Sequence, residues 1–196
     1  MATLTPIRVT EQAQRLAAEK LQPGDLALDG TAGKGRDTAF LAQQVGPTGH
    51  VHSFDIQTEA IAATENLLNL AGLAPQVTLH HRSHAELRSA LPTAHLGKIK
   101  VALFNLGYLP GGNQKIITLP DSTAQALQAT YENLCPLGRL IVVVYTGHEG
   151  GPAEADVVQQ FAEACVQQGA SIQYHGDPNF IFKPWIVVVD RPEAVR

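Results

Sequence analysis

Residues 26–38 read LALDGTAGKGRDT, and this stretch decides the fold class of the chain. A short apolar run, Leu26 to Leu28, ends at Asp29, and a glycine-rich turn, Gly30 to Gly35, follows it. The next residues, about Asp37 to Val45, are predicted to form a helix that Gly46 and Pro47 end. A strand, a glycine turn and a helix in this order predict the start of a βαβ unit.

The same alternation continues along the chain. Further strands are predicted at residues 51–54, 77–80, 100–105, 139–145, 171–175 and 185–189, and helices at 8–20, 58–71, 84–91, 122–134 and 153–168. Strands that alternate with helices imply a parallel sheet covered on both faces, and the short last connection favours an antiparallel pair at one edge. We expect one α/β domain, residues 1–196, with a doubly wound, mostly parallel, seven-stranded sheet.

Composition narrows the protein class. The 196 residues are 44% hydrophobic and 16% charged, which is typical of a globular chain that needs no disulfide or metal to stabilise its core. The net charge of −4 argues against nucleic-acid binding by bulk electrostatics, although Lys34, Arg36, Arg82 and Lys115 could form a local basic patch. Since we find neither a membrane-spanning apolar run nor a signal-peptide core, we expect a cytoplasmic protein.

Acidic and glycine residues collect where the first two predicted strands end. Asp29 ends the first strand and Asp55 ends the second, so both should lie at the carboxyl edge of the sheet, where open α/β sheets bind ligands. Gly33 and Gly35 would let the backbone approach a ligand at points where a side chain would collide with it. A carboxylate at Asp55 can accept both ribose hydroxyls of a nucleoside.

Two cofactors fit this outline. A nicotinamide dinucleotide requires a third glycine where this chain has Thr38, and Asp37 would place a negative charge beside its phosphates. Asp29, just before the turn, instead suits the cationic methionine end of S-adenosylmethionine. The residues favour S-adenosylmethionine, with the dinucleotide and a ligand-free turn as alternatives. The candidate cofactor-binding residues are Asp29, Thr31, Gly33, Lys34, Gly35, Asp37, Thr38, Asp55, Ile56, Gln57, Ser83, His84 and Asn105.

The run Asn105-Leu106-Gly107-Tyr108 follows the fourth predicted strand, where amino-group methyltransferases carry an Asn/Asp-Pro-Pro-Tyr/Phe loop. A target nitrogen must aim its lone pair at the methyl group, in line with the departing sulfur. The Asn105 oxygen and the Leu106 carbonyl could hold the hydrogens of the amine, while Tyr108 could stack on the target base. The alternative for Asn105 is a strand-end asparagine that caps a turn.

Histidines supply two further hypotheses. His148 lies in a glycine-rich segment after the fifth strand and could act as a base or contact a phosphate, although a surface histidine is an equal alternative. His80, His81 and His84 mimic metal-ligand spacing, but neighbours on a strand point to opposite faces, so we expect no metal site. Ser83 and His84 are better interpreted as neighbours of an adenine pocket.

Four stretches together resemble one family: DGTAGKGRDT (29–38), FDIQ (54–57), FNLGYLPGG (104–112) and YTGHEGG (145–151). The chain is similar to the bacterial tRNA methyltransferases that act on 5-aminomethyl-2-thiouridine, formerly described as rRNA methylases. It departs from them at Ala32 and Lys34, where the family often has Cys and Asn, and at Thr146, where it often has His.

The resemblance implies the fold of the S-adenosylmethionine-dependent methyltransferases, methyl transfer to the exocyclic amine of the wobble uridine in a tRNA anticodon loop, and a homodimer. Asn105, Tyr108 and His148 are the candidate catalytic residues. Three alternatives stay open: another amino methyltransferase acting on an rRNA base or a protein amine, a nicotinamide-dependent oxidoreductase, and a non-catalytic nucleotide-binding protein.

Overall fold

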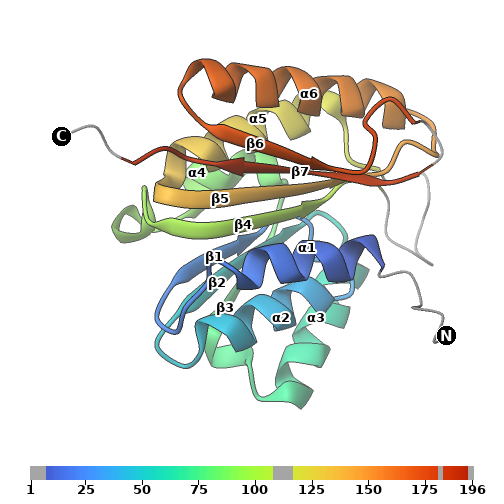
Figure 1. The fold of residues 1–196 in the computed structure, drawn as a ribbon. Helices are drawn as coiled ribbons and strands as arrows, with labels where there is room; N and C mark the ends of the chain where they lie inside the picture. The colour runs from blue at the N-terminus through green and yellow to red at the C-terminus, as the bar shows by residue number, and fades with distance from the viewer. Residues whose placement is uncertain (1–7, 108–116, 181–182, 194–196) are drawn as a thin grey trace, which may run out of the picture.

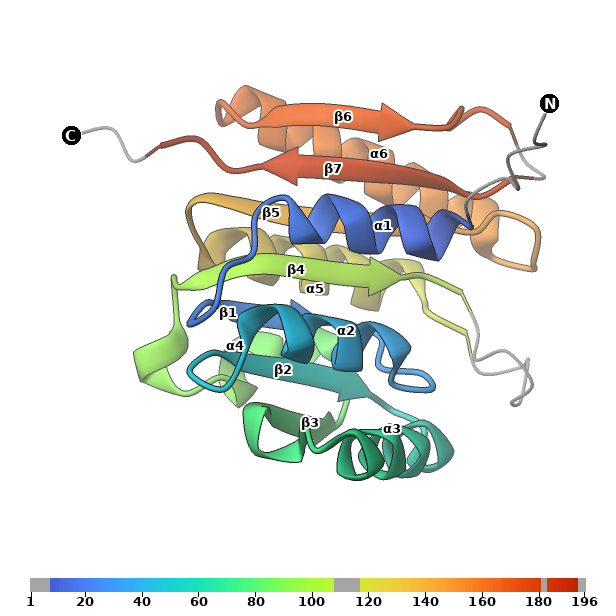
Figure 2. The same cartoon turned by 60° about the horizontal axis from the view of Figure 1, so that its bottom comes forward.

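Seven strands form one sheet in the computed structural model of the protein, which describes residues 8–107, 117–180 and 183–193 (Figure 1). The strands are β1 (Leu26–Asp29), β2 (His50–Asp55), β3 (Val77–His81), β4 (Ile99–Asn105), β5 (Leu134–Val144), β6 (Ser171–His175) and β7 (Trp185–Asp190). Their order is β3-β2-β1-β4-β5-β7-β6, and only β7 runs antiparallel to its neighbours (Figure 2). The expected α/β class and the antiparallel pair at one edge are confirmed.

Helices cover both faces of the sheet, as the alternation predicts. They are α1 (Val9–Ala18), α2 (Arg36–Val45), α3 (Thr58–Ala71), α4 (Leu87–Ala90), α5 (Pro120–Asn133) and α6 (Gly151–Gln167), with the short 3-10 turns η1 (Ala74–Gln76), η2 (His84–Glu86) and η3 (Thr93–His95). Helices α1, α2 and α3 lie on one face, and α4, α5 and α6 lie on the other (Figures 1 and 2). No described helix is long and apolar enough to cross a membrane.

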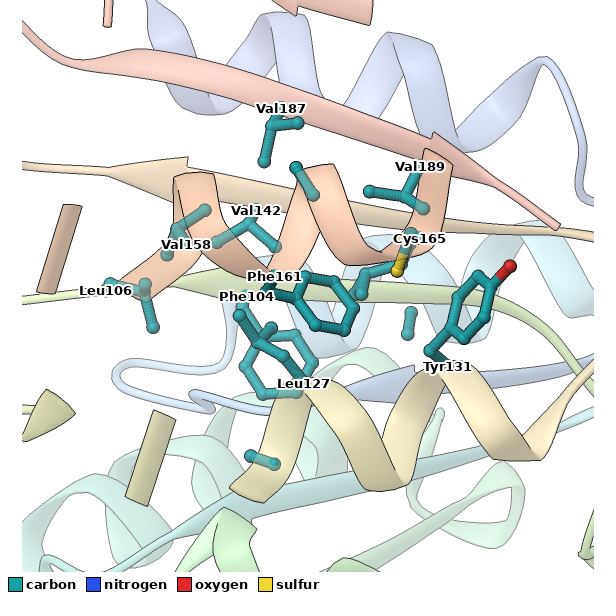
Figure 3. Close-up of a cluster of buried hydrophobic side chains, with 14 of the residues drawn as sticks. Phe104, Leu106, Leu127, Tyr131, Val142, Val158, Phe161, Cys165, Val187 and Val189 are labelled. Carbon is teal, nitrogen blue, oxygen red and sulfur yellow. The ribbon is translucent and has the colours of Figure 1, made fainter. Parts of the chain in front are cut away.

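The core is split into two layers by the alternation of side chains along each strand. On β1, Ala27 packs toward α1 and α2, whereas Leu28 packs toward the opposite face. Figure 3 shows that second layer, in which Phe104 of β4 lies near Leu127 of α5 and Phe161 of α6. Central strands buried on both faces consist of continuous apolar residues, which is why the sequence revealed them so clearly.

The start of β5 differs from the prediction. The strand begins at Leu134, directly after α5, and not at Arg139. Leu134 pairs with Ile99 of β4, and the register then shifts before Arg139 pairs with Val101. Pro136 and Gly138 lie in the irregular part, and because such residues usually end strands, they hid the pairing from a sequence pattern.

Candidate active site

A cavity of about 700 Å³ opens at the carboxyl ends of β1, β2, β4 and β5. The strand order reverses between β1 and β4, so the cavity lies at the switch point where open α/β sheets bind ligands. The structure brings eleven predicted site residues together on its walls: Thr31, Gly33, Lys34, Asp37, Asp55, Ile56, Gln57, Ser83, His84, Asn105 and His148. Tyr108 lies outside the described residues, so its role stays a prediction.

Asp29 lies behind the cavity wall, although the sequence pointed to it as the acid for a cationic ligand. It is completely buried, and its Oδ1 accepts a hydrogen bond from the Thr31 N–H at 3.0 Å. Its Oδ2 accepts the hydroxyl hydrogen of Thr38 at 2.6 Å. Asp29 and Thr38 therefore brace the glycine turn from below and do not line the cavity.

Gly35 has a packing role that the sequence did not reveal. Its φ of +78° lies in the left-handed region, and a Cβ there would be 2.9 Å from the Cα of Thr64 on α3. The glycine thus lets the start of α2 approach α3, and it does not line the cavity. Gly33 does line the cavity, and its contact with a ligand stays a prediction.

Asp55 holds one end of the cavity. Its Oδ2 accepts the N–H of Gly33 at 2.9 Å, and its Oδ1 accepts the N–H of Gln57 at 2.9 Å. Each carboxylate oxygen keeps a second lone pair that can accept a ligand hydroxyl. Exposed Ile56 and buried His84 also line the cavity, and His84 donates from Nδ1 to the Gly30 carbonyl at 3.1 Å. Polar acceptors beside an apolar side chain suit the ribose and base of a nucleoside.

Asn105 and Asp37 meet at the centre of the cavity wall. Asp37 Oδ2 accepts a hydrogen bond from Asn105 Nδ2 at 2.5 Å, and its Oδ1 accepts one from Gln14 Nε2 at 2.6 Å. The Oδ1 atom of Asn105 is buried and has no hydrogen-bond partner among the described residues. Because a buried acceptor without a donor costs roughly 1–3 kcal/mol, this oxygen marks a place for a ligand N–H.

Negative charge gathers around the same point. Burial and the neighbouring Asp37 raise the pKa of Asp29 to about 7, and burial also raises the pKa of Asp37. The charge of Asp55 contributes to the raised pKa of Asp29. Because a nearby cation would stabilise all these carboxylates in their charged form, the geometry favours a positively charged ligand.

Asp29→Asn is expected to remove a pH-dependent loss of stability. The folded-state pKa of about 7 lies above the ordinary value of 3.8, so Asp29 stabilises the fold most at low pH, and this contribution is lost as the pH rises through about 7. Asparagine can still accept from Thr31 and can donate to Thr38 without ionising. We therefore expect the stability of the wild type, measured by thermal unfolding and taken relative to that of the variant, to be lower near pH 8 than near pH 5.

The control for this experiment is Asp156→Asn, which alters an exposed carboxylate on α6. Its difference from the wild type should be the same at both pH values. If the difference in thermal stability between Asp29→Asn and the wild type is also the same at both pH values, the pKa of Asp29 is not raised.

The opposite end of the cavity is held together by Glu154, which the sequence analysis missed. Its carboxylate is almost completely buried on α6 and accepts hydroxyl hydrogens from Thr118 at 2.7 Å and from Thr123 at 2.5 Å. Thr118 Oγ1 also accepts the N–H of Gly107 at 2.8 Å. His148 Nε2 would lie 3.5 Å from a Cβ on Gly107. Through Thr118, Glu154 therefore fixes the position of Gly107, which lies beside His148.

The three histidines with metal-like spacing point to different partners. His80 Nε2 lies 3.0 Å from His52 Nδ1, and His81 Nε2 lies 3.1 Å from the Ile56 carbonyl oxygen. His84 contacts Gly30, as described above. Within the described ranges, no group of three or more His, Cys, Asp or Glu side chains is arranged to hold a metal ion.

Comparison with known proteins identifies relatives over most of the chain. The family described as "Putative rRNA methylase" matches residues 51–189. The chain is 38% identical over 162 residues to an Arabidopsis thaliana protein named "tRNA (mnm(5)s(2)U34)-methyltransferase, chloroplastic", covering 79% of this chain and 58% of that protein. It is 35% identical over 92 residues to the ribosomal RNA small subunit methyltransferase H of Novosphingobium aromaticivorans, covering 47% of this chain and 27% of that protein. The chain thus spans less than two thirds of these relatives.

Solved structures agree with the fold. A "putative rRNA-methylase" from Clostridium thermocellum superposes with a TM-score of 0.87 at 34% identity, covering 95% of this chain and 99% of that one. A "putative methyltransferase" from Streptococcus mutans, solved in complex with S-adenosylhomocysteine (SAH), superposes with a TM-score of 0.82 at 29% identity and the same coverage.

Proposed function

Because this chain belongs to the family described as "Putative rRNA methylase", we propose that it is a methyltransferase that uses S-adenosylmethionine. Its proposed substrate is the exocyclic amine of 5-aminomethyl-2-thiouridine at the wobble position of a tRNA anticodon loop. The observation that carries the proposal is the buried Oδ1 of Asn105, an acceptor without a donor in the wall of the cavity. The tRNA methyltransferase relative and the SAH-bound neighbour support it.

The residues present fit the proposed cofactor. Asp55, Ile56 and His84 would hold its nucleoside, and the negative charge that gathers around the glycine turn suits its positively charged methionine end. When bound, S-adenosylmethionine supplies an electrophilic methyl group. A dinucleotide fits less well, because its pyrophosphate requires a helix N-terminus free of negative charge, and Asp37 occupies the first turn of α2.

Asn105 has the geometry to orient an amine. Its Nδ2 is tied to Asp37, which is itself held by Gln14, so the carboxamide plane is fixed and Oδ1 is the atom that is left without a donor. An amine that donates one hydrogen to Oδ1 has its lone pair aimed in a defined direction. Fixing this direction in advance lowers the entropic part of the barrier.

Exposed cations at the cavity are suited to RNA phosphates. Lys34 of the glycine turn and Arg36 at the start of α2 line the cavity, which supports the hypothesis of a local basic patch, and Lys183 joins them from just before β7. Arg82 is exposed but does not line the cavity, and Lys115 lies outside the described residues. A local basic patch is compatible with the net charge of −4. Flipping a wobble base out of a single-stranded loop costs little free energy, because the base is not paired there.

We also propose that residues 1–196 form a single domain, that the protein is a homodimer, and that it is located in the cytoplasm. The sequence and the family resemblance support these three features. Light scattering of the purified protein would measure the oligomeric state directly.

The function is tested by mass spectrometry of tRNA nucleosides. Purified protein, S-adenosylmethionine and tRNA that carries 5-aminomethyl-2-thiouridine should give the methylaminomethyl nucleoside, and the same tRNA with an unmodified wobble uridine should give no product. A parallel assay supplies small-subunit rRNA; if the protein methylated that rRNA and left the tRNA unchanged, the proposed substrate would be overturned, and the result would favour the function named for the Novosphingobium relative.

Asp55→Ala is expected to weaken SAH binding by at least about tenfold, because each hydrogen bond to a carboxylate contributes roughly 1.5–3 kcal/mol. Calorimetric titration with SAH measures this directly. Asp55→Asn keeps one acceptor oxygen and should bind with intermediate affinity. Circular dichroism checks that both variants stay folded although they lose hydrogen bonds to the Gly33 and Gln57 N–H groups. An unchanged dissociation constant in Asp55→Ala would rule out a ribose contact.

A further inference from the structure

The proposed reaction needs a group that removes a proton, because an alkylamine is largely protonated near neutral pH and an ammonium nitrogen has no free lone pair. We propose that Asp37 is this catalytic base, and that its carboxylate takes the proton from a substrate ammonium held by Asn105 Oδ1. This inference rests on the proposed function and assigns the proton acceptor that the sequence left open.

The position of Asp37 carries the inference. It lies in the first turn of α2, lines the cavity, and accepts one hydrogen bond on each oxygen, from Gln14 and from Asn105. Each oxygen keeps a second lone pair. Because Asn105 donates from Nδ2 to Asp37 and leaves Oδ1 without a partner, an ammonium bound to Oδ1 would lie near the Asp37 carboxylate. The acceptor that aims the nitrogen and the acceptor of its proton are therefore neighbours.

The surroundings of Asp37 make it a stronger base than an exposed aspartate. Burial raises its pKa, whereas its hydrogen bonds to Gln14 and Asn105 and the charge of Arg36 on α2 act in the opposite direction. Asp29 faces it from β1, and Tyr145 faces it from the end of β5, with a pKa raised by burial and by the charge of Asp37. A base works best when its pKa lies near the working pH.

The proton and electron balance closes without another reactant. An N–H bond of the ammonium breaks, its electron pair stays on nitrogen, and an O–H bond forms on Asp37. The freed lone pair then attacks the methyl carbon, whose bond to sulfur breaks with both electrons going to sulfur. The product is a secondary ammonium, and Asp37 returns its proton to water.

Other carboxylates are less suitable. Asp29 does not line the cavity, Glu154 is enclosed behind Thr118, and Asp55 is tied to Gly33 and Gln57 at the nucleoside end. His148 does line the cavity and is therefore the comparison residue in the test.

The test compares Asp37→Asn with the wild type in single-turnover methylation of the aminomethyl tRNA over a range of pH. Near neutral pH the variant should be slower by about a hundredfold or more, which is typical for loss of a general base. Its rate should rise about tenfold per pH unit and approach the wild-type rate near the pKa of the free amine, at about pH 10. SAH affinity, measured by calorimetry, should change by less than about threefold.

Two further variants keep the test decisive. Asp37→Asn combined with Asn105→Asp exchanges the two side chains, preserves an amide–carboxylate hydrogen bond, and should recover at least about tenfold of the lost rate. His148→Gln should show no comparable recovery at high pH. The inference is overturned if the exchange recovers nothing, if His148→Gln shows the alkaline recovery instead, or if Asp37→Asn loses SAH affinity by more than about tenfold without recovery.

The last of these results would assign Asp37 to the ammonium of the cofactor. If the wild type itself fails to methylate the aminomethyl tRNA while it binds SAH, the proposed function is wrong, and the inference fails with it. The measurement on the wild type therefore distinguishes a failure of the proposed function from a failure of the inference about Asp37.

Discussion

Asn105→Ala is expected to slow single-turnover methylation by roughly a hundredfold or more, which corresponds to a barrier increase near 3 kcal/mol. The substitution removes the Oδ1 acceptor that orients the amine and leaves β4 in place, since the Asn105 backbone N–H still donates to Thr31 Oγ1. A positioning contact contributes little in the ground state and much in the transition state. SAH affinity should therefore change only severalfold.

Asn105→Asp is the companion variant. It keeps an acceptor oxygen but places a second carboxylate beside Asp37, in place of the present hydrogen bond of 2.5 Å. Two neighbouring carboxylates raise the pKa of one of them, so partial activity with an altered pH profile is expected. A wild-type single-turnover rate in Asn105→Ala would show that Asn105 is only a turn cap, and the active site would then have to centre on His148.

Gly30→Ala is expected to destabilise the fold by about 3 kcal/mol or to prevent folding. A Cβ at residue 30 would lie 2.0 Å from Cε1 of Phe104, far inside van der Waals contact. The two groups cannot separate easily, because the Gly30 N–H donates to the Leu103 carbonyl at 2.9 Å and Phe104 is completely buried. Urea unfolding, followed by circular dichroism, measures the loss.

The matched control is Gly147→Ala, since a Cβ at that glycine has no atom within 4 Å. It should unfold at the same urea concentration as the wild type. Adding Phe104→Leu to Gly30→Ala removes the clashing ring atoms and should restore part of the stability, so the double variant should be more stable than the sum of the two single effects. A Gly30→Ala protein as stable as the wild type would contradict the packing of β1 against β4.

Local patterns determined the architecture of this protein. Apolar strands, helical spacing and glycines within a few residues of each other predicted the βαβ units. They also placed Asp29, Asp55 and Asn105 at the ends of β1, β2 and β4. These elements were readable because strand polarity follows from chain order alone: in a parallel sheet every carboxyl end lies at one edge. Most of the candidate site residues therefore lie around one cavity.

Only the tertiary structure decided which acid faces the cavity. Asp29 and Asp37 both adjoin the glycine turn, yet Asp29 is bound by Thr31 and Thr38 beneath it, whereas Asp37 lines the cavity. The partners of Asp37 are 23 and 68 residues away along the chain, on α1 and β4. Contacts between residues so far apart in the sequence leave no periodic pattern in it. The direction of a side chain in the first turn of α2 also depends on how that helix packs. Glu154 was missed for the same reason, because its partners Thr118 and Thr123 become neighbours only when α5 packs against α6.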